Sequence, residues 1–224
     1  MKAMDVMNRE VVTVGPGTDV SEAARLLAEH DVSALPVVDG DRHVIGILSE
    51  ADLMRREEIG TGTQRPWWLE AVTPASTLAT EFTKSHGRKV SEVMSPSVIS
   101  ASEDASLADI ASILERNRIK RVPILRNGEL VGIVSRANLI QALASSGPVS
   151  GGDRDGDREI RLALLDELAK QPWTDFGSRN VIVSDGTVHI WGLVSSEQER
   201  RALIAMAETI PDVKSVADEM IPAY

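Results

Sequence analysis

The first 145 residues of this chain contain one sequence pattern twice, and this repeat constrains the fold more than any other feature. Val6-Met7 recurs 87 residues later as Val93-Met94, and Leu35-Pro36-Val37 recurs at the same spacing as Val122-Pro123-Ile124. Gly46-Ile47-Leu48-Ser49 recurs after 86 residues, because the preceding turn is one residue shorter in the second copy. Two copies of one folding unit are too few for a solenoid, so we expect a pseudo-symmetric pair that shares a cleft.

Both copies predict the same order of elements, β-α-β-β-α. A β-branched stretch at 11–14 or 98–100 is followed by apolar residues at helical spacing. Asp19 with Glu22, and Ser106 with Asp109, have the spacing of a capping box at the helix start. Two strands and a closing helix complete each copy, with the strands ending near Val38, Leu48, Leu125 and Val134 and the helices beginning at Ser49 and Ser135.

The composition changes after a Gly/Ser/Asp-rich stretch at 145–157, which we interpret as a linker that transmits orientation poorly. The segment beyond it predicts the order α-β-β-α-β, with a hairpin around Asp185-Gly186. The expected fold class is therefore α/β (α+β), a pseudo-symmetric pair of β-α-β-β-α units followed by a small domain. The expected divisions are 1–60, 61–89 (an insert between the repeats), 90–145, 146–156 (a flexible linker) and 157–224.

Composition excludes several classes of function. The chain has no cysteine and no apolar run long enough to span a membrane, which favours a cytoplasmic protein. Its net charge of −10 divides as −4 for residues 1–150 and −6 for residues 151–224, so neither part is expected to bind nucleic acid. The sequence shows no nucleophile paired with a base, no phosphate-cradling glycine loop and no metal-ligand cluster. We therefore do not expect an enzyme or a required metal.

Gly46-Ile47-Leu48-Ser49-Glu50-Ala51-Asp52-Leu53, echoed at 132–139, is the sharpest local signal. A Ser followed three residues later by Asp after a strand is explained by helix capping alone. The same corner is also suited to a ligand, because a carboxylate there can accept both hydroxyls of a ribose and the backbone N–H groups can meet a phosphate. Two further features stay open. Trp67-Trp68 in the insert suit core packing, a dimer face or base stacking, and the basic run at 116–126 suits solvent or phosphate.

Repeated in register, these motifs resemble a tandem cystathionine-β-synthase (CBS) domain pair over roughly residues 1–145. The resemblance implies a dimeric sensor that binds AMP, ADP, ATP, NAD or S-adenosylmethionine in the cleft between the copies, with AMP and ATP first among them. It implies that Asp52 holds the ribose diol, and that Asn138, which lacks the charge of an Asp, makes a weak or empty second site. The other implied ligand residues are Thr13, Ala34, Leu35, Pro36, Ser49, Ser100, Lys120, Arg121, Val122, Pro123 and Ser135.

The C-terminal segment is similar to a BON domain. The resemblance rests on residues 188–194 after Asp185-Gly186 and on residues 210–216, although the family often has Gly where this chain has Asp212. It implies a small module that contacts a protein or phospholipid partner. The expected function is therefore a non-enzymatic, bacterial CBS-pair regulatory protein that forms a homodimer. The alternatives are a ligand-independent dimerisation scaffold and BON-mediated binding to the inner leaflet of a membrane.

Overall fold

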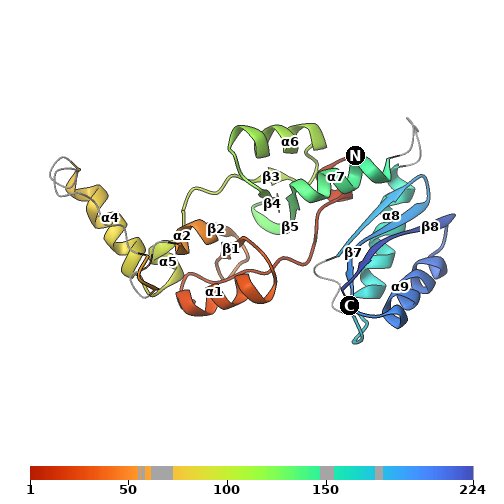
Figure 1. Ribbon diagram of the computed structural model, residues 1–224. Helices are drawn as coiled ribbons and strands as arrows, with labels where there is room; N and C mark the ends of the chain where they lie inside the picture. The colour runs from red at the N-terminus through yellow and green to blue at the C-terminus, as the bar shows by residue number, and fades with distance from the viewer. Residues whose placement is uncertain (55, 57–58, 62–72, 147–153, 175–178, 224) are drawn as a thin grey trace. The chain divides into compact units, whose positions relative to one another are not determined.

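The contacts in the computed structural model divide the chain into two compact units, and each unit contains parts of both sequence repeats (Figure 1). Unit 1 comprises residues 1–11, 100–126 and 131–224, and unit 2 comprises residues 12–99 and 127–130. The structure describes all residues except 55, 57–58, 62–72, 147–153, 175–178 and 224. The tryptophan pair Trp67-Trp68 therefore lies outside the described residues.

Unit 2 contains the elements of the first repeat. Strands β1 (Ala34–Val38) and β2 (Val44–Ser49) pair antiparallel, with Ala34 opposite Ser49. The apolar face of α1 covers a core that also takes in the start of the second repeat, through Val90 and Val93. The remaining elements of the unit are α1 (Val20–Glu29), α2 (Glu50–Leu53), α4 (Ala75–His86) and α5 (Val90–Val93).

Unit 1 contains most of the second repeat, together with the opening segment of the chain. A three-stranded sheet has the order β3-β4-β5, in which β3 runs parallel to β4. Its core combines Ile110 and Leu114 of the first long helix with residues of the chain's opening segment, Ala3, Val6 and Met7. The elements are η1 (Ala3–Asp5), β3 (Ala101–Ser102), α6 (Leu107–Arg116), β4 (Arg121–Arg126), β5 (Glu129–Ser135) and α7 (Arg136–Ser145).

The C-terminal part of unit 1 has the predicted order α-β-β-α-β. Its sheet has the order β6-β7-β8, with β6 and β7 antiparallel and β7 and β8 parallel. The elements are α8 (Arg154–Leu168), β6 (Asn180–Ser184), β7 (Thr187–Val194), α9 (Glu197–Thr209) and β8 (Ser215–Pro222).

The predicted hairpin between β6 and β7 is confirmed. Asp185 and Gly186 both have positive φ, 53° and 77°, as the two central residues of a type I′ turn require. The buried carboxylate of Asp157 accepts hydrogen bonds from both of their N–H groups, at 3.0 and 2.8 Å. Asp212 likewise has a φ of 65°, so this chain makes the left-handed turn without the glycine.

A buried ion pair supports the same domain. Arg179 and Glu199 approach to 2.7 Å between Nη2 and Oε1, with side chains 7% and 6% exposed. Burial raises the pKa of Glu199, but hydrogen bonds from Ser195 and Thr174 and the charge of Arg179 outweigh burial and lower that pKa from 4.5 to about 2. The carboxylate is therefore ionised in the folded protein at neutral pH.

Two local predictions are wrong in detail. In the first repeat the predicted strand at 11–14 is reduced to one parallel bridge between Val14 and Val37, and in the second repeat the strand lies at Ala101–Ser102 rather than at 98–100. At α6 the serine half of the capping box forms, since Ser106 Oγ accepts a hydrogen bond from the N–H of Asp109, while the Asp109 carboxylate accepts from the Ser106 hydroxyl. At α1 the Asp19 carboxylate pairs instead with Lys89 at 3.0 Å, which lies just before α5.

The C-terminal domain packs on the second repeat, in contrast to the loose coupling expected from the linker. Helix α8 begins at Arg154, inside the expected linker range, and its buried Arg161 donates hydrogen bonds to the carbonyl oxygens of Met4 and Met7 in the opening segment. The side chain of Ile182 belongs to the core of the second repeat, and the Trp191 indole N–H donates to Ser145 of α7. Polar and apolar contacts together therefore fix this domain within unit 1.

The Val-Met and Gly-Ile motifs form one contact that crosses between the repeats. A Cβ on Gly46 would lie 2.4 Å from the sulfur of Met94, and a Cβ on Gly132 would lie 2.5 Å from the sulfur of Met7. The glycines therefore leave room for the methionine of the other copy to lie against the backbone. This contact explains why the two motifs recur together.

Candidate ligand sites at the two repeated motifs

The Asp52 carboxylate lies in the first turn of α2 and is held by three residues that are far apart in the chain, Ser49, Lys84 and Ser95. Its Oδ2 accepts hydrogen bonds from the N–H of Ser49 at 3.0 Å and from its hydroxyl at 2.7 Å. Its Oδ1 accepts from Lys84 Nζ at 3.0 Å and from the Ser95 hydroxyl at 3.4 Å. The Asp52 side chain is 11% exposed, so this carboxylate is oriented and partly shielded from water.

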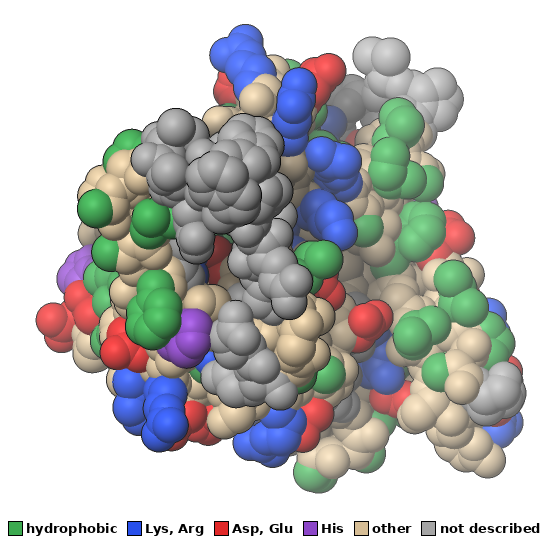
Figure 2. Space-filling model, turned by 60° about the vertical axis from the view of Figure 1, so that its left-hand side comes forward, with side chains coloured by type: hydrophobic (Ala, Val, Ile, Leu, Met, Phe, Trp, Pro, Cys, Tyr) green, Lys and Arg blue, Asp and Glu red, His purple; other side chains and the backbone are tan. Residues whose placement is uncertain are grey.

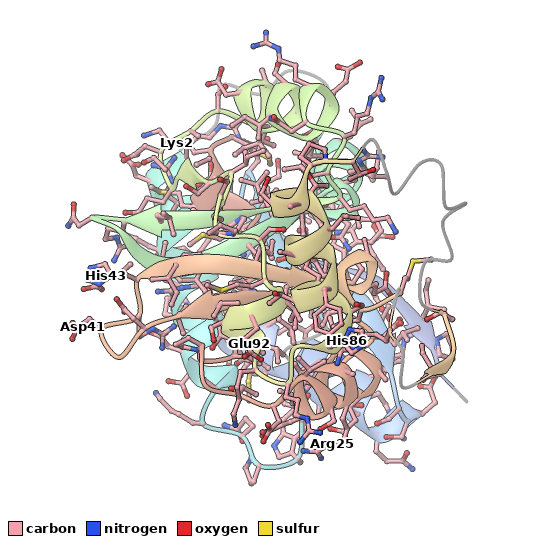
Figure 3. The ribbon with its side chains drawn as sticks, turned by 90° about the vertical axis from the view of Figure 1, so that its left-hand side faces the viewer. Lys2, Arg25, Asp41, His43, His86 and Glu92 are labelled. Carbon is pink, nitrogen blue, oxygen red and sulfur yellow. The ribbon has the colours of Figure 1, made fainter. Side chains whose placement is uncertain are left out.

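Lys84 is positioned by the turn between α4 and α5. The buried guanidinium of Arg56 donates to the carbonyl oxygens of Lys84 and Gly87 at the C-terminal end of α4. After that turn the Glu92 carboxylate accepts from the N–H groups of Arg88 and Lys89, which lowers the pKa of Glu92. Figure 3 labels Glu92 together with His86, the last residue of α4. Lys84, whose ammonium group contacts Asp52, therefore lies at an end of α4 that is held by hydrogen bonds from Arg56.

The second motif has the same geometry but a different chemistry. Asn138 Oδ1 accepts from the N–H and the hydroxyl of Ser135, at 2.7 and 2.8 Å, as the corresponding Asp52 oxygen does from Ser49. Its Nδ2, in contrast, donates to Asn8 Oδ1 at 3.4 Å and to Gln141 Oε1 at 3.2 Å. Asn138 is 4% exposed. The second site therefore presents a buried donor where the first presents an acceptor.

The other predicted site residues fall into two groups. Unit 2 brings Thr13 beside β1, since the N–H of the next residue donates to the Pro36 carbonyl, and it holds Ala34, Leu35 and Pro36 buried on β1. Unit 1 places Ser100 just before β3, Lys120 just before β4 and Arg121 at the start of β4. It also buries Val122 and Pro123, and links the Lys120 carbonyl to the N–H of Arg136 beside Ser135. A cleft lined by both groups stays a prediction.

Ser95 and Asn8 were missed by the sequence analysis. Each follows the methionine of a Val-Met pair and forms an antiparallel bridge with the strand of the other repeat, Ser95 with Ile47 and Asn8 with Ile133. Each thereby reaches the motif residue, Asp52 or Asn138. Their positions, 87 residues apart and directly after the repeated Val-Met, were the available signal.

The surface and composition of the described residues add three observations. On the face shown in Figure 2, acidic and basic side chains lie next to one another. Among the described residues, no group of three or more His, Asp or Glu side chains is arranged to hold a metal ion. None of the described helices is both long enough and apolar enough to cross a membrane.

Comparison with known families identifies the class of protein. The profile of the CBS domain matches residues 3–58 and 90–145, and that of the BON domain matches residues 156–221. The chain therefore belongs to the CBS domain family and carries a C-terminal BON domain. Both resemblances expected from the sequence are confirmed.

Individual relatives match the CBS part. CBS domain-containing protein CBSX1, chloroplastic, from Arabidopsis thaliana is 33% identical over 135 residues, which cover 58% of this chain and 57% of that protein. CBS domain-containing protein YhcV from Bacillus subtilis is 32% identical over 136 residues, 60% of this chain and 80% of that protein. Among solved structures, CBSX2 in complex with AMP has a TM-score of 0.56 at 28% identity, and the match covers 64% of this chain and 96% of that one. This chain thus spans little more than half the length of the chloroplastic relative.

Proposed function

We propose that this chain is a non-enzymatic regulatory protein whose CBS pair binds an adenosyl ligand through Asp52. The observation that carries the proposal is the oriented Asp52 carboxylate, fixed through one oxygen by Ser49 and flanked at the other by Ser95 and Lys84. The similarity to CBSX2, which was crystallised with AMP, supports the choice of ligand class.

The chemistry of this corner suits a ribose phosphate. Carboxylate oxygens accept strong hydrogen bonds from vicinal hydroxyls, and a serine hydroxyl can donate or accept beside them. Lys84 now neutralises Asp52, and a ribose that displaced its ammonium group would leave this cation near the bound ligand. A phosphate or other anionic group of the ligand would then replace the lost partner of Lys84.

A thermal-shift titration with AMP, ADP, ATP, NAD and S-adenosylmethionine tests the proposal. A ligand at about 100 times its Kd stabilises the native state by about 2.7 kcal/mol, which raises Tm by several degrees. Asp52→Ala should abolish that shift. Asp109→Ala is the matched control, because Asp109 has the same spacing and the same 2.7 Å bond to the serine at its helix start but lies outside both motifs.

The outcomes separate the alternatives. A shift with one ligand that Asp109→Ala keeps and Asp52→Ala loses supports the sensor and names its signal. Equal loss in both variants would mean that general destabilisation, not a lost ligand contact, removed the shift. No shift with any of the five compounds favours the ligand-independent scaffold.

The remaining parts of the proposal concern assembly and partners. The CBS pair forms a homodimer in the cytoplasm, and the BON domain contacts a protein or phospholipid partner. Leu193 and Ile221 support an apolar contact surface on the BON sheet, because they are paired across β7 and β8 and are 54% and 63% exposed. Sedimentation equilibrium tests the dimer. Flotation with liposomes tests the lipid partner, for which the acidic C-terminal part predicts weak binding to anionic vesicles.

A further inference from the structure

Asn138, which stands where the first motif has Asp52, takes part in a contact between the second repeat and the BON domain. Asn138 donates to Gln141 of α7, and the same oxygen of Gln141 accepts a hydrogen bond at 3.1 Å from Asn180 Nδ2, the first residue of β6 in the BON domain. Asn180 is 3% exposed, so this contact is buried. A row of three amide side chains therefore leads from the second motif into the BON domain.

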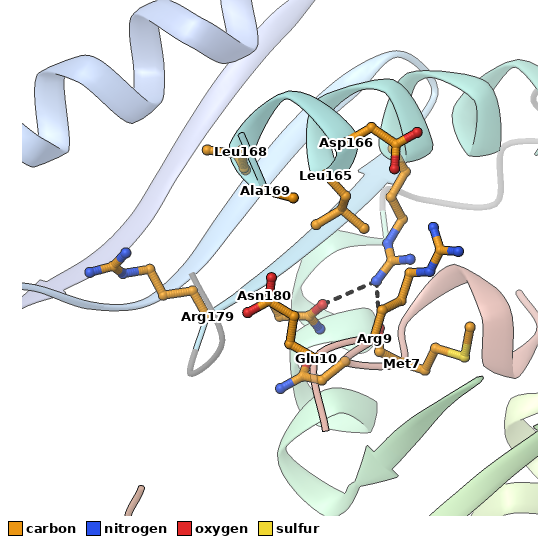
Figure 4. Close-up of a pocket in the computed structure, with 11 residues that line it drawn as sticks. Met7, Arg9, Glu10, Leu165, Asp166, Leu168, Ala169, Arg179 and Asn180 are labelled. Atoms are coloured by element: carbon orange, nitrogen blue, oxygen red, sulfur yellow. Dashed lines mark hydrogen bonds between the residues drawn. The ribbon is translucent and has the colours of Figure 1, made fainter. Parts of the chain in front are cut away.

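The orientation of each amide in that row is fixed by neighbouring groups that can only donate, or only accept, a hydrogen bond. Arg161 has only donors, and it donates to Asn180 Oδ1 at 3.3 Å, which is the dashed line that ends at the labelled Asn180 in Figure 4. Asn180 Nδ2 must then donate, which it does to the carbonyl of Val6 at 3.0 Å and to Gln141 Oε1. Gln141 thus presents an acceptor to position 138.

The other side of Asn138 is fixed as well. The N–H of Ser135 can only donate, so it requires an acceptor oxygen on the residue at 138. Position 138 must therefore offer an acceptor to Ser135 and a donor to Gln141. An amide meets both requirements, whereas an ionised Asp, as at the first motif, would place a second acceptor against Gln141 Oε1.

We propose that the second CBS motif of this chain is a docking site for its own BON domain, and that Asn138 is the residue that locks it. The relay from Asn138 through Gln141 and Asn180 to Arg161 occupies the place that corresponds, at the first motif, to Asp52 Oδ1 with its partners Lys84 and Ser95. A ribose at Asn138 would have to take the amide group that docks the BON domain. The second motif thus holds a protein domain instead of a nucleotide.

Hydrogen exchange of the full-length chain, followed by mass spectrometry, tests the proposal with three variants. Asn138→Asp reverses the polarity at one point and should speed exchange about tenfold or more in residues 1–8, 136–145 and 180–184, which meet at the relay. Gln141→Glu keeps the oxygen that both neighbours use and should leave these rates within about twofold. Asp52→Asn makes the opposite change at the first motif and should leave them unaltered. Exchange in α9, in the BON core, is the internal reference.

Each outcome decides the matter. Faster exchange with Asn138→Asp but not with Gln141→Glu supports docking by the polarity of the relay. Equal effects of the two variants would mean that any added charge loosens the contact, and unchanged rates in Asn138→Asp would mean that the apolar contacts alone hold the domain; either result overturns the proposal. If Asn138→Asp does not fold, Gln141→Met removes the shared acceptor without adding charge. It should then give the faster exchange that Gln141→Glu lacks.

Discussion

Replacing Arg161 by Met should cost the protein about 3 kcal/mol of unfolding free energy. Arg161 is 3% exposed, and its guanidinium donates to the carbonyl oxygens of Val181 at 2.7 Å, Met7 at 2.6 Å and Met4 at 3.1 Å. Burial, aided by the charge of Arg9 and opposed by that of Asp5, lowers the pKa of Arg161 from 12.5 to about 10. The side chain is therefore still charged at pH 7.

The magnitude follows from what the substitution leaves behind. Each buried carbonyl that loses its donor costs about 1–3 kcal/mol, and the bonds lost are to a charged donor, at the stronger end of the range. Two effects oppose this loss. The cost of burying a cation disappears, and water can enter the adjoining cavity of about 200 Å³ that Met7, Asn8 and Arg161 help to line (Figure 4). A net loss of about 3 kcal/mol remains.

Urea denaturation at pH 7, followed by circular dichroism, measures this change. Arg201→Met is the matched control, because Arg201 lies exposed on α9 and should change the free energy of unfolding by no more than about 0.5 kcal/mol. A loss below about 1 kcal/mol for Arg161→Met, or a gain, would refute the reasoning, because it would mean that desolvation of the guanidinium cancels its hydrogen bonds.

Three further predictions concern other parts of the chain. Lys84→Met should strengthen the binding of adenosine about twofold to fivefold in calorimetry, because the Lys84 ammonium group competes with the ribose for Asp52. Adenosine has no phosphate with which that ammonium group could pair instead. Weaker adenosine binding would contradict this prediction. The pKa of Glu199 is lowered from 4.5 to about 2, so its ionised carboxylate stabilises the fold fully above about pH 5. This contribution of about 3 kcal/mol is lost as the pH falls toward 2. Glu199→Gln should therefore reduce the dependence of the unfolding free energy on pH in the acid range. Gly132→Ala should lower the free energy of unfolding by about 2 kcal/mol, and Gly46→Ala by less than about 1 kcal/mol. The new Cβ at 132 would lie 3.0 Å from a backbone carbonyl oxygen, whereas the nearest atoms to a Cβ at 46 belong to a flexible methionine side chain. Equal losses in thermal unfolding would refute the distinction.

Local patterns predicted the repeats, the order of elements in the BON domain and the Asp185-Gly186 hairpin, because these depend on residues close together in the chain. The packing of each Val-Met segment on the other repeat could not be predicted in this way. By sequence pattern alone, an apolar pair could pack equally well against the strand of its own copy. The buried position of Arg161 had a faint signal. It follows the core residue Ile160 and lies three and seven positions before Leu164 and Leu168, so helical spacing places a cation among core residues.

At the candidate site, the sequence predicted the local geometry, and ligand binding there stays a prediction. Asp52 and Ser49 followed from the motif, and their mutual hydrogen bonds agree with the predicted capping geometry. Lys84 and Gln141 reach the motifs from elsewhere in the fold as single polar residues without a pattern of their own. Only the folded chain brings them to the carboxylate or the amide, so no spacing rule could have selected them.

The crossing of the opening segments also sets an order of events during synthesis. Asn8 forms both backbone hydrogen bonds of its bridge with Ile133, a residue that is made 125 positions later. At about 5–20 residues per second, the first segment emerges and then waits for about 6 to 25 s before its strand partner exists. During that interval Val6 and Met7 are exposed apolar residues, because the backbone at Gly132 against which Met7 packs has not been made. The backbone at Gly46 likewise waits for the side chain of Met94. This chain is therefore most prone to misfolding while the ribosome translates the segment between the two repeats.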